Sequence, residues 1–336
     1  IPTADHIVLC MPVHKYRACL QEIAPFINSD KTVCVGALYG QAGFNWMVDE
    51  IKRQYQLKNV VTFSFGLLPW ICRIIELRRD DGVLRTVVTY GGKAVNYAAC
   101  YPQSFFSQLN EEFFENIGFR WFGKGHTEQS ENFLSLTLSV DNQIIHTSRC
   151  FGLYSVYGPT WSQQSDVPMF YRDYDDVSAK LLADLDADYS KVRERIKLMF
   201  PEKNFKHMLD YLALERFSYQ SQNTDVKESF VTSQTLTSIA TPVVQNEQGL
   251  WEIDRRHRFF LDDIYYGNAI AKWMAEKLKI NVPTIDAILH WAQKVRNEHF
   301  IDENNHLLLN SPDLSAPLKS GIPCFYGYQT IEEVVD

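Results

Sequence analysis

Short apolar runs alternate with amphipathic segments along the first 65 residues. Ile7–Met11, Thr32–Leu38 and Val60–Phe65 have the length and composition of fully buried strands. The segments between them, His14–Ile27 and Phe44–Tyr55, place apolar side chains at helical spacing. This alternation of strands and helices with short joints predicts a parallel, doubly wound sheet.

The pattern changes after Leu68-Pro69-Trp70. Two strand-like segments, Arg73–Leu77 and Val83–Thr89, flank the turn sequence Arg79-Asp80-Asp81-Gly82. We expect this hairpin to finish the sheet with an antiparallel pair of strands.

From about residue 94 onward the pattern is mostly helical. Helices are predicted over Gln103–Ile117, Asn132–Val140, Asn142–Tyr154, Asp175–Phe200, Phe205–Phe217, Asp263–Lys279 and Thr284–His299. The polar stretch Gln220–Glu247 is typical of a surface excursion, and Leu250–Ile253 of a weak strand. We therefore predict an α/β domain over residues 1–130 and a helical domain over residues 131–336.

Composition and charge exclude several classes of protein. The 336 residues are 46% hydrophobic and 22% charged, which fits a globular chain rather than a disordered or fibrous one. The net charge of −8 gives no general attraction to nucleic acids or anionic membranes. No apolar run approaches the roughly 18 residues that a membrane span needs. Seven scattered cysteines favour a reducing compartment, so we expect the cytoplasm.

Three features offer candidate chemistry, and each has a structural alternative. Glycines at positions 36, 40 and 43 lie between a predicted strand and a helix, where they form either a ligand-binding edge or a tight turn. His146 lies in an apolar helix and is either catalytic or a satisfied core histidine. The basic run Arg255–Arg258 is a carboxylate site or a solvated face, and Asp262 or Asp263 could cap the following helix. No spacing indicates a metal site.

Six short segments occur in a characteristic order. They are Ala4–Pro12, Gly40–Phe44 (GQAGF), Leu68–Arg73 (LPWICR), Ile145-His146, Arg258 with Asp263, and Trp291-Ala292-Gln293. Together they resemble the octopine/nopaline dehydrogenase family, the opine dehydrogenases, over nearly the whole chain. The resemblance implies a Rossmann-type domain followed by a mainly helical domain. It also implies an enzyme that condenses an amino acid with an α-keto acid, such as pyruvate, and reduces the imine with NAD(P)H.

The resemblance assigns roles residue by residue. His146 matches the family's catalytic histidine, and Asp263 matches its carboxylate partner. The positions that match the substrate side of the cleft are Arg258, Gln41 and Trp70, with Arg258 binding the keto-acid carboxylate. The positions that match the side facing the cofactor, NAD or NADP, are Met11, Pro12, Gly40 and Cys72. Leu67 and Thr147 stand where the family is expected to have threonine and proline, and these departures bear on the amine substrate.

The family's glycine-rich phosphate turn has no counterpart in the sequence from Ile1 onward. We therefore expect roughly half of a Rossmann domain, on the order of 80 residues, to lie upstream of Ile1. Two other interpretations stay open. One is another two-domain NAD(P)-dependent dehydrogenase, a class that usually relies on a lysine in its helical domain. The other is a non-catalytic relative that lacks the cofactor phosphate site. In either enzymatic case we expect small-molecule substrates and a monomer or weak homodimer.

Overall fold

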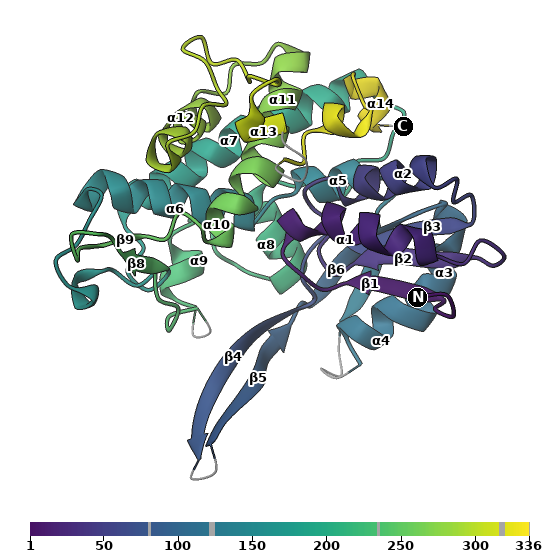
Figure 1. The fold of residues 1–336 in the computed structure, drawn as a ribbon, viewed down its shortest axis with the longest axis horizontal. Coiled ribbons are helices and arrows are strands. Elements are labelled where there is room, and N and C mark those ends of the chain that lie inside the picture. Colours follow the sequence, from purple (N-terminus) through teal and green to yellow (C-terminus); the bar gives the residue numbers. More distant parts are fainter. Residues whose placement is uncertain (80–81, 121–124, 234–235, 316–319, 336) are drawn as a thin grey trace.

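The computed structural model describes residues 1–79, 82–120, 125–233, 236–315 and 320–335. It consists of a sheet with helices on both faces, a projecting two-stranded ribbon, and a mainly helical part (Figure 1). The turn predicted at Asp80 and Asp81 lies outside the described residues.

The sheet has five strands in the order β1-β2-β3-β6-β7. They are β1 (His6–Leu9), β2 (Val33–Ala37), β3 (Val60–Phe65), β6 (Val95–Tyr101) and β7 (His126–Gln129). The first three strands run parallel to one another, which confirms the predicted parallel strands. β6 is antiparallel to β3, and β7 is parallel to β6. Every residue of β2 and β3 is buried, as expected for strands that helices cover on both faces.

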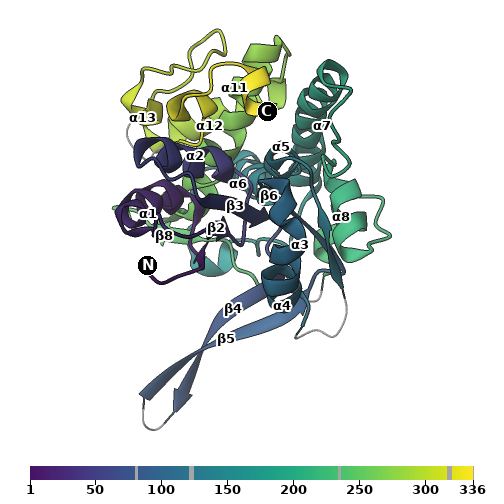
Figure 2. The same ribbon diagram turned by 90° about the vertical axis from the view of Figure 1, so that its right-hand side faces the viewer.

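The prediction that the hairpin finishes the sheet was wrong. β4 (Trp70–Arg79) and β5 (Gly82–Gly92) pair with each other and project from the body as a ribbon (Figures 1 and 2). The sheet continues instead through β6, whose residues Asn96–Cys100 are buried. Its sequence, Val-Asn-Tyr-Ala-Ala-Cys-Tyr, mixes Val and Tyr, which favour strands, with Asn and Ala, which do not, so the signal for it in the sequence was weak.

Helices cover both faces of the sheet (Figure 2). One layer contains η1 (Val13–Lys15), α1 (Tyr16–Ile23), η2 (Ala24–Phe26) and α2 (Phe44–Gln54). The other layer contains η3 (Gln103–Phe105), α3 (Phe106–Leu109), η4 (Asn110–Phe114) and α4 (Glu115–Gly118). The helix predicted over Gln103–Ile117 is therefore present, although it begins as a 3-10 turn and is π-helical in its middle.

The second part of the chain is mainly helical, as predicted. Its helices are α5 (Phe133–Leu138), α6 (Asn142–Tyr157), η5 (Gln164–Asp166), α7 (Asp176–Met199), α8 (Tyr211–Tyr219), α9 (Glu228–Val231), α10 (Arg258–Leu261), η6 (Ile264–Asn268), α11 (Ala269–Leu278), α12 (Pro283–Arg296), α13 (Pro312–Ser315), η7 (Pro323–Tyr326) and α14 (Ile331–Val335). A small antiparallel pair consists of β8 (Val243–Gln245) and β9 (Trp251–Ile253). Within the described ranges, no helix is both long enough and apolar enough to cross a bilayer.

Two segments of this part differ from the prediction. The helix expected from Phe205 begins at Tyr211, because the Asp210 carboxylate accepts a hydrogen bond from the Ala213 backbone N–H at 2.8 Å and caps it there. The stretch after Tyr219 is not only a surface excursion. It contains α9, in which Phe230 is buried against Tyr174 with ring centroids 4.5 Å apart.

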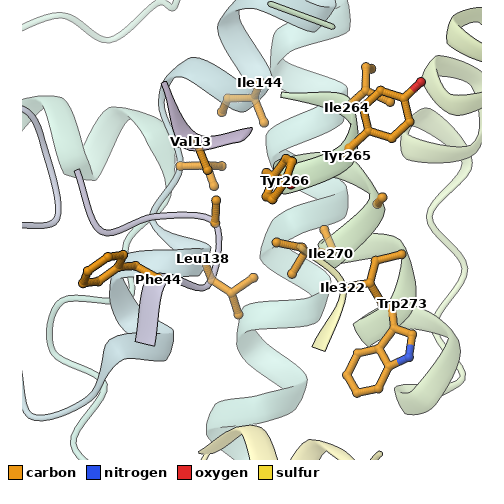
Figure 3. Packing of buried hydrophobic residues seen from close by; sticks show 14 of the residues in the cluster. Val13, Phe44, Leu138, Ile144, Ile264, Tyr265, Tyr266, Ile270, Trp273 and Ile322 are labelled. Atoms are coloured by element: carbon orange, nitrogen blue, oxygen red, sulfur yellow. The ribbon is translucent and has the colours of Figure 1, made fainter. Parts of the chain in front are cut away.

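One continuous core joins the sheet to the helical part. Figure 3 shows Phe44 of α2 in the same cluster as Ile144 of α6, Tyr266 of η6 and Ile270 of α11. The chain's last elements also return to the first part, where the Trp46 indole N–H donates to the Gly321 carbonyl at 3.0 Å. Shared packing of this kind fixes α6 and η6 relative to the ends of the parallel strands.

Candidate active site

A buried histidine–aspartate pair lies between α6 and the residue that precedes η6. His146 Nδ1 and Asp263 Oδ2 are 2.8 Å apart, and the two side chains are 1% and 4% exposed. Burial, together with the neighbouring Asp262 carboxylate, raises the pKa of Asp263 well above its usual range, while the Arg258 guanidinium opposes this shift. Because Nδ1 lies within hydrogen-bond distance of Oδ2, Nε2 is left as the nitrogen for proton exchange.

The backbone around Asp263 sets the position of its carboxylate. The Asn268 backbone N–H donates to the Asp263 carbonyl at 2.9 Å, five residues back, and Asn268 Nδ2 donates to the same carbonyl at 3.0 Å. Gly267 allows η6 to pack closely on α6, since a Cβ at this position would lie 2.3 Å from Gln143 Cγ. A π-helical turn thus stands against α6 one turn before His146, and such turns are frequent at functional sites.

The two consecutive aspartates have different partners. Asp262 Oδ1 accepts a hydrogen bond from the His14 backbone N–H at 3.0 Å and lies 2.6 Å from His14 Nδ1. This contact ties the end of α10 to η1, which follows β1. Asp263 makes no side-chain bond that caps η6. Helix capping, the structural alternative for these residues, is therefore not their role, and Asp263 is directed at His146.

Aromatic side chains surround the imidazole of His146. The Tyr171 hydroxyl lies 3.2 Å from Nε2, and the Phe259 ring stacks on the imidazole with centroids 3.7 Å apart. These contacts fix the plane of the ring and give Nε2 a hydroxyl partner on the side away from Asp263. The structural alternative for His146, a core histidine whose hydrogen bonds are all made within the protein, explains its burial. It does not explain why His146 lines a cavity.

Arg149 fixes the segment that carries Tyr171, and sequence reasoning missed both residues. The Arg149 side chain is fully buried and lies 2.5 Å from the Asp175 carboxylate. Its other N–H groups donate to backbone carbonyls of the segment 169–173. A signal was present in the sequence, because a charged residue one turn beyond His146 in an apolar helix requires a buried partner.

A cavity of about 570 Å³ lies between the base of the ribbon and the helical part, and we call it the ribbon-side cavity. His146, Tyr171 and Arg258 line it from the helical part. Trp70 and Cys72, two of the predicted site residues, line it from the start of β4. The structure therefore brings these sequence-predicted residues together across the two parts of the chain.

A second cavity of about 360 Å³ lies at the carboxyl ends of β1 and β2, and we call it the strand-end cavity. Met11 and Pro12, predicted to face the cofactor, line it together with Asp263. The two cavities adjoin, because four residues line both of them: Leu38, Leu68, Asn142 and Arg258. The carboxyl edge of a parallel sheet is where doubly wound folds bind their ligands.

Arg258 lies at the junction of the two cavities, where its guanidinium can bind a ligand. The residue is exposed, and its guanidinium carbon lies 5.2 Å from the centre of the Phe259 ring. Among the described residues, no carboxylate forms an ion pair with it. An unpaired guanidinium beside a buried histidine–aspartate pair is suited to a ligand that carries a carboxylate.

Gly40 and Gln41 lie outside the lining of both cavities, which differs from the predicted roles. Gly40 packs against β3, and a Cβ there would lie 2.4 Å from Ser64 Oγ. Gln41 is fully buried, and its Nε2 donates to the carbonyls of Gly66 at 3.1 Å and Ser139 at 3.0 Å. These residues therefore brace the end of β3 against the segment before α6.

The chain is similar in sequence to known proteins over most of its length. The family model described as the NAD/NADP octopine/nopaline dehydrogenase alpha-helical domain matches residues 129–296. An opine dehydrogenase of Haliotis discus hannai is 24% identical over 342 residues, which cover 100% of this chain and 79% of the relative. An octopine dehydrogenase of Pecten maximus is 24% identical over 344 residues, with coverages of 100% and 79%.

The solved structures contain the same fold. A structure of octopine dehydrogenase with NADH and L-arginine superposes with a TM-score of 0.75 at 21% identity, covering 99% of this chain and 78% of that one. This likeness supports the predicted arrangement of a Rossmann-type domain followed by a helical domain. The expectation that further strand–helix units lie upstream of Ile1 stays a prediction.

Proposed function

The chain belongs to the octopine/nopaline dehydrogenase family, and from that premise we propose that it is an NAD(P)-dependent opine dehydrogenase. The reaction joins the amino group of an amino acid to an α-keto acid such as pyruvate and reduces the imine, which makes the enzyme an oxidoreductase that acts on a CH–NH group. One observation carries the proposal. An unpaired arginine stands where two cavities adjoin, beside a buried histidine–aspartate pair.

The strand-end cavity suits the nicotinamide end of the cofactor. Leu9, Met11 and Val13 give it an apolar wall, and Asn142 gives it an amide for polar contact. Met11 and Pro12 would hold the ring from the strand side. Cys72 lies in the adjoining ribbon-side cavity, where its Sγ is 3.3 Å from Thr89 Oγ1. When bound, the nicotinamide supplies the hydride. The octopine dehydrogenase relative holds NADH, which supports this class of cofactor.

Arg258 binds the keto acid in this proposal. A guanidinium presents two parallel N–H donors that match the two oxygens of one carboxylate. Because Arg258 lines both cavities, a keto acid held there has its carbonyl carbon near the boundary between the two compartments. Orientation of this kind contributes to rate because the reacting groups are held close together before reaction.

His146 exchanges protons with the reacting groups. The amine must lose a proton as it adds to the carbonyl, and the carbinolamine hydroxyl must gain one to leave as water. His146 Nε2 can do both, since the ordinary pKa of imidazole lies near neutrality. Asp263, at Nδ1, stabilises the charged imidazolium and holds the ring in place. The Tyr171 hydroxyl, at 3.2 Å from Nε2, orients the nitrogen toward the cavity.

Asp263→Asn tests whether the aspartate acts through His146. We expect kcat to fall, because an amide cannot stabilise the imidazolium as a carboxylate does. The double variant with His146→Ala should be no more than about threefold slower than His146→Ala alone, since residues that act as a unit have non-additive effects. Steady-state kinetics of the three variants measure this. Losses that multiply would instead assign Asp263 an independent role.

The proposed function is tested with a grid of amino acids against α-keto acids. The intact protein is mixed with NADH or NADPH, and loss of absorbance by the reduced cofactor reports turnover. We expect at least one amine and keto-acid pair to consume the cofactor and to yield a secondary amine whose mass is that of both substrates minus one water plus two hydrogens, because condensation releases water and reduction adds a hydride and a proton. Keto-acid reduction that needs no amine would favour a hydroxy-acid dehydrogenase. No turnover with any pair would favour the non-catalytic alternative.

A further inference from the structure

The acidic and basic side chains that line the ribbon-side cavity differ in whether the protein itself provides them with partners. Among the residues that the structure describes, two acidic side chains line it, and both accept hydrogen bonds from the chain itself. Glu215 Oε1 accepts from the Tyr211 hydroxyl at 3.0 Å, and its Oε2 accepts from Ser229 at 2.6 Å. Asp141 Oδ1 accepts from the Asn142 backbone N–H at 2.6 Å. These carboxylates therefore do not depend on a ligand for their hydrogen bonds.

Two basic side chains among the described residues of the cavity wall differ from the acidic ones, because neither forms an ion pair with a carboxylate of the described chain. They are Arg258, described above, and Lys93, which lies between β5 and β6. Lys93 is only 6% exposed, and in the part of the chain that the structure describes it has no carboxylate partner. Its Nζ donates to the Tyr219 hydroxyl at 2.5 Å and lies 4.3 Å from the centre of that ring. Burying an ammonium group without a counter-ion costs free energy. Two of the three N–H groups of Lys93 stay available to donate hydrogen bonds to a ligand.

The backbone holds Lys93 firmly at the wall of the cavity. Its N–H donates to the Pro69 carbonyl at 3.1 Å, and the N–H of Ala94 donates to the Ser218 carbonyl at 2.8 Å. The first bond ties the two ends of the ribbon together, and the second joins the base of the ribbon to α8. The ammonium is thereby placed on the wall formed by the ribbon and α8, whereas Arg258 comes from α10 at the junction with the strand-end cavity.

We propose that Lys93 is the anchor for the acid group of the amine substrate. The proposal rests on the proposed function and extends it, because the secondary-amine product carries one acid group from each substrate. Arg258 binds the group that comes from the keto acid, and Lys93 binds the group that comes from the amine. The substrate class that follows is an amine with an anionic group, such as an α-carboxylate, and not a simple alkylamine.

Lys93 also contacts the end of α8, and the experiment must separate the effect of this contact on stability from substrate binding. Its ammonium lies beside the C-terminal residue of α8, where a positive charge stabilises the helix dipole, and it contacts the Tyr219 ring. A role in stability alone would change the melting temperature of the protein but not the ratio of the two KM values. The kinetic split between the substrates is therefore the deciding measurement.

The first test compares Lys93→Gln with Lys93→Arg in the intact enzyme. Lys93→Gln should raise KM for the amine about 10- to 100-fold, the range for loss of a charge-assisted hydrogen bond, while KM for the keto acid changes by less than about threefold. Lys93→Arg should restore most of the amine affinity because it keeps the charge. The matched control is Lys52→Gln, which removes another lysine over a tyrosine ring, 5.7 Å from Tyr101, outside the cavity. Equal changes in both KM values for Lys93→Gln would overturn the proposal.

The second test removes the other partner of the contact. The amino acid found in the grid is compared with the matching amine that lacks the carboxylate. In the wild type, loss of the carboxylate should weaken kcat/KM about 10- to 100-fold, whereas in Lys93→Gln the two amines should differ by less than about threefold. Losses that multiply would show that Lys93 does not contact the acid group.

The third test keeps this inference distinct from the proposed function. If no pair in the grid turns over, the proposed function fails, and Lys93 is tested by binding alone. The probe is iminodiacetate, a small secondary amine with two carboxylates, titrated by calorimetry in the presence of NADH. Binding to the wild type that weakens about tenfold or more in Lys93→Gln supports the anchor. Absent binding, or equal binding to both proteins, overturns it.

Discussion

Replacing His146 with alanine should lower kcat by about 10²- to 10⁴-fold, the usual contribution of a general acid–base group. The effect is expected because Nε2 faces the Tyr171 hydroxyl in the lining of the ribbon-side cavity, while Nδ1 is occupied by Asp263. Cofactor affinity should change little, since the strand-end cavity is not lined by His146. Steady-state rates, cofactor titration and thermal melting of the variant measure these outcomes.

His207 provides a matched control for this prediction. It is also a buried histidine, with Nε2 3.1 Å from the Glu128 carboxylate and its ring stacked on Tyr97 at 5.5 Å. Burial lowers the pKa of His207, and it lines neither cavity. His207→Ala should therefore lower the melting temperature and leave kcat nearly unchanged. If His146→Ala keeps more than about a third of the activity, it lacks the loss expected of an acid–base group, and the core-histidine interpretation is right.

The parallel strands could be predicted because their signal is local. Val60–Phe65 is buried on both faces, so its sequence is an unbroken apolar run that periodicity identifies without knowledge of the neighbours. β6 could not be found in this way. It holds alanines and an asparagine, and it is a strand because β3, β7 and two layers of helices surround it. Tertiary packing there outweighs weak local propensity.

The part of the candidate site that could be predicted consists of residues whose type alone indicates their chemistry. A histidine in the apolar helix α6 and an Asp-Asp pair after a basic run are visible in the sequence, although the pattern alone left open which aspartate serves the histidine, and only the family resemblance indicated Asp263. That choice depends on η6, whose π-helical turn directs Asp263 to α6 while Asp262 contacts His14. The domain boundary near residue 130 stays a prediction.

The residues that sequence reasoning missed are brought to the site by contacts between distant segments. Tyr171 stands 25 positions from His146, in a segment without regular structure that a buried arginine holds. Lys93 meets Tyr219 across 126 positions. Sequence periodicity cannot reveal a contact such as Lys93 with Tyr219, because the contact forms only when the base of the ribbon packs on α8. The alternative of another two-domain dehydrogenase relies on a lysine of the helical domain, whereas Lys93, which the fold brings into the cavity lined by His146, comes from the segment between β5 and β6.

Arg258→Lys should raise KM for the keto acid by about 10- to 100-fold, because lysine keeps the charge but loses the planar pair of donors that binds both carboxylate oxygens. KM for the amine should change by less than about threefold, since the acid group of the amine is assigned to Lys93. The control is Arg256→Lys, which alters an exposed arginine two positions earlier that lines neither cavity. Initial rates with each substrate varied in turn measure both constants. Arg258→Lys and Lys93→Gln should thus weaken opposite substrates, and if both variants weaken the same substrate, the two cations do not divide the acid groups of the product between them.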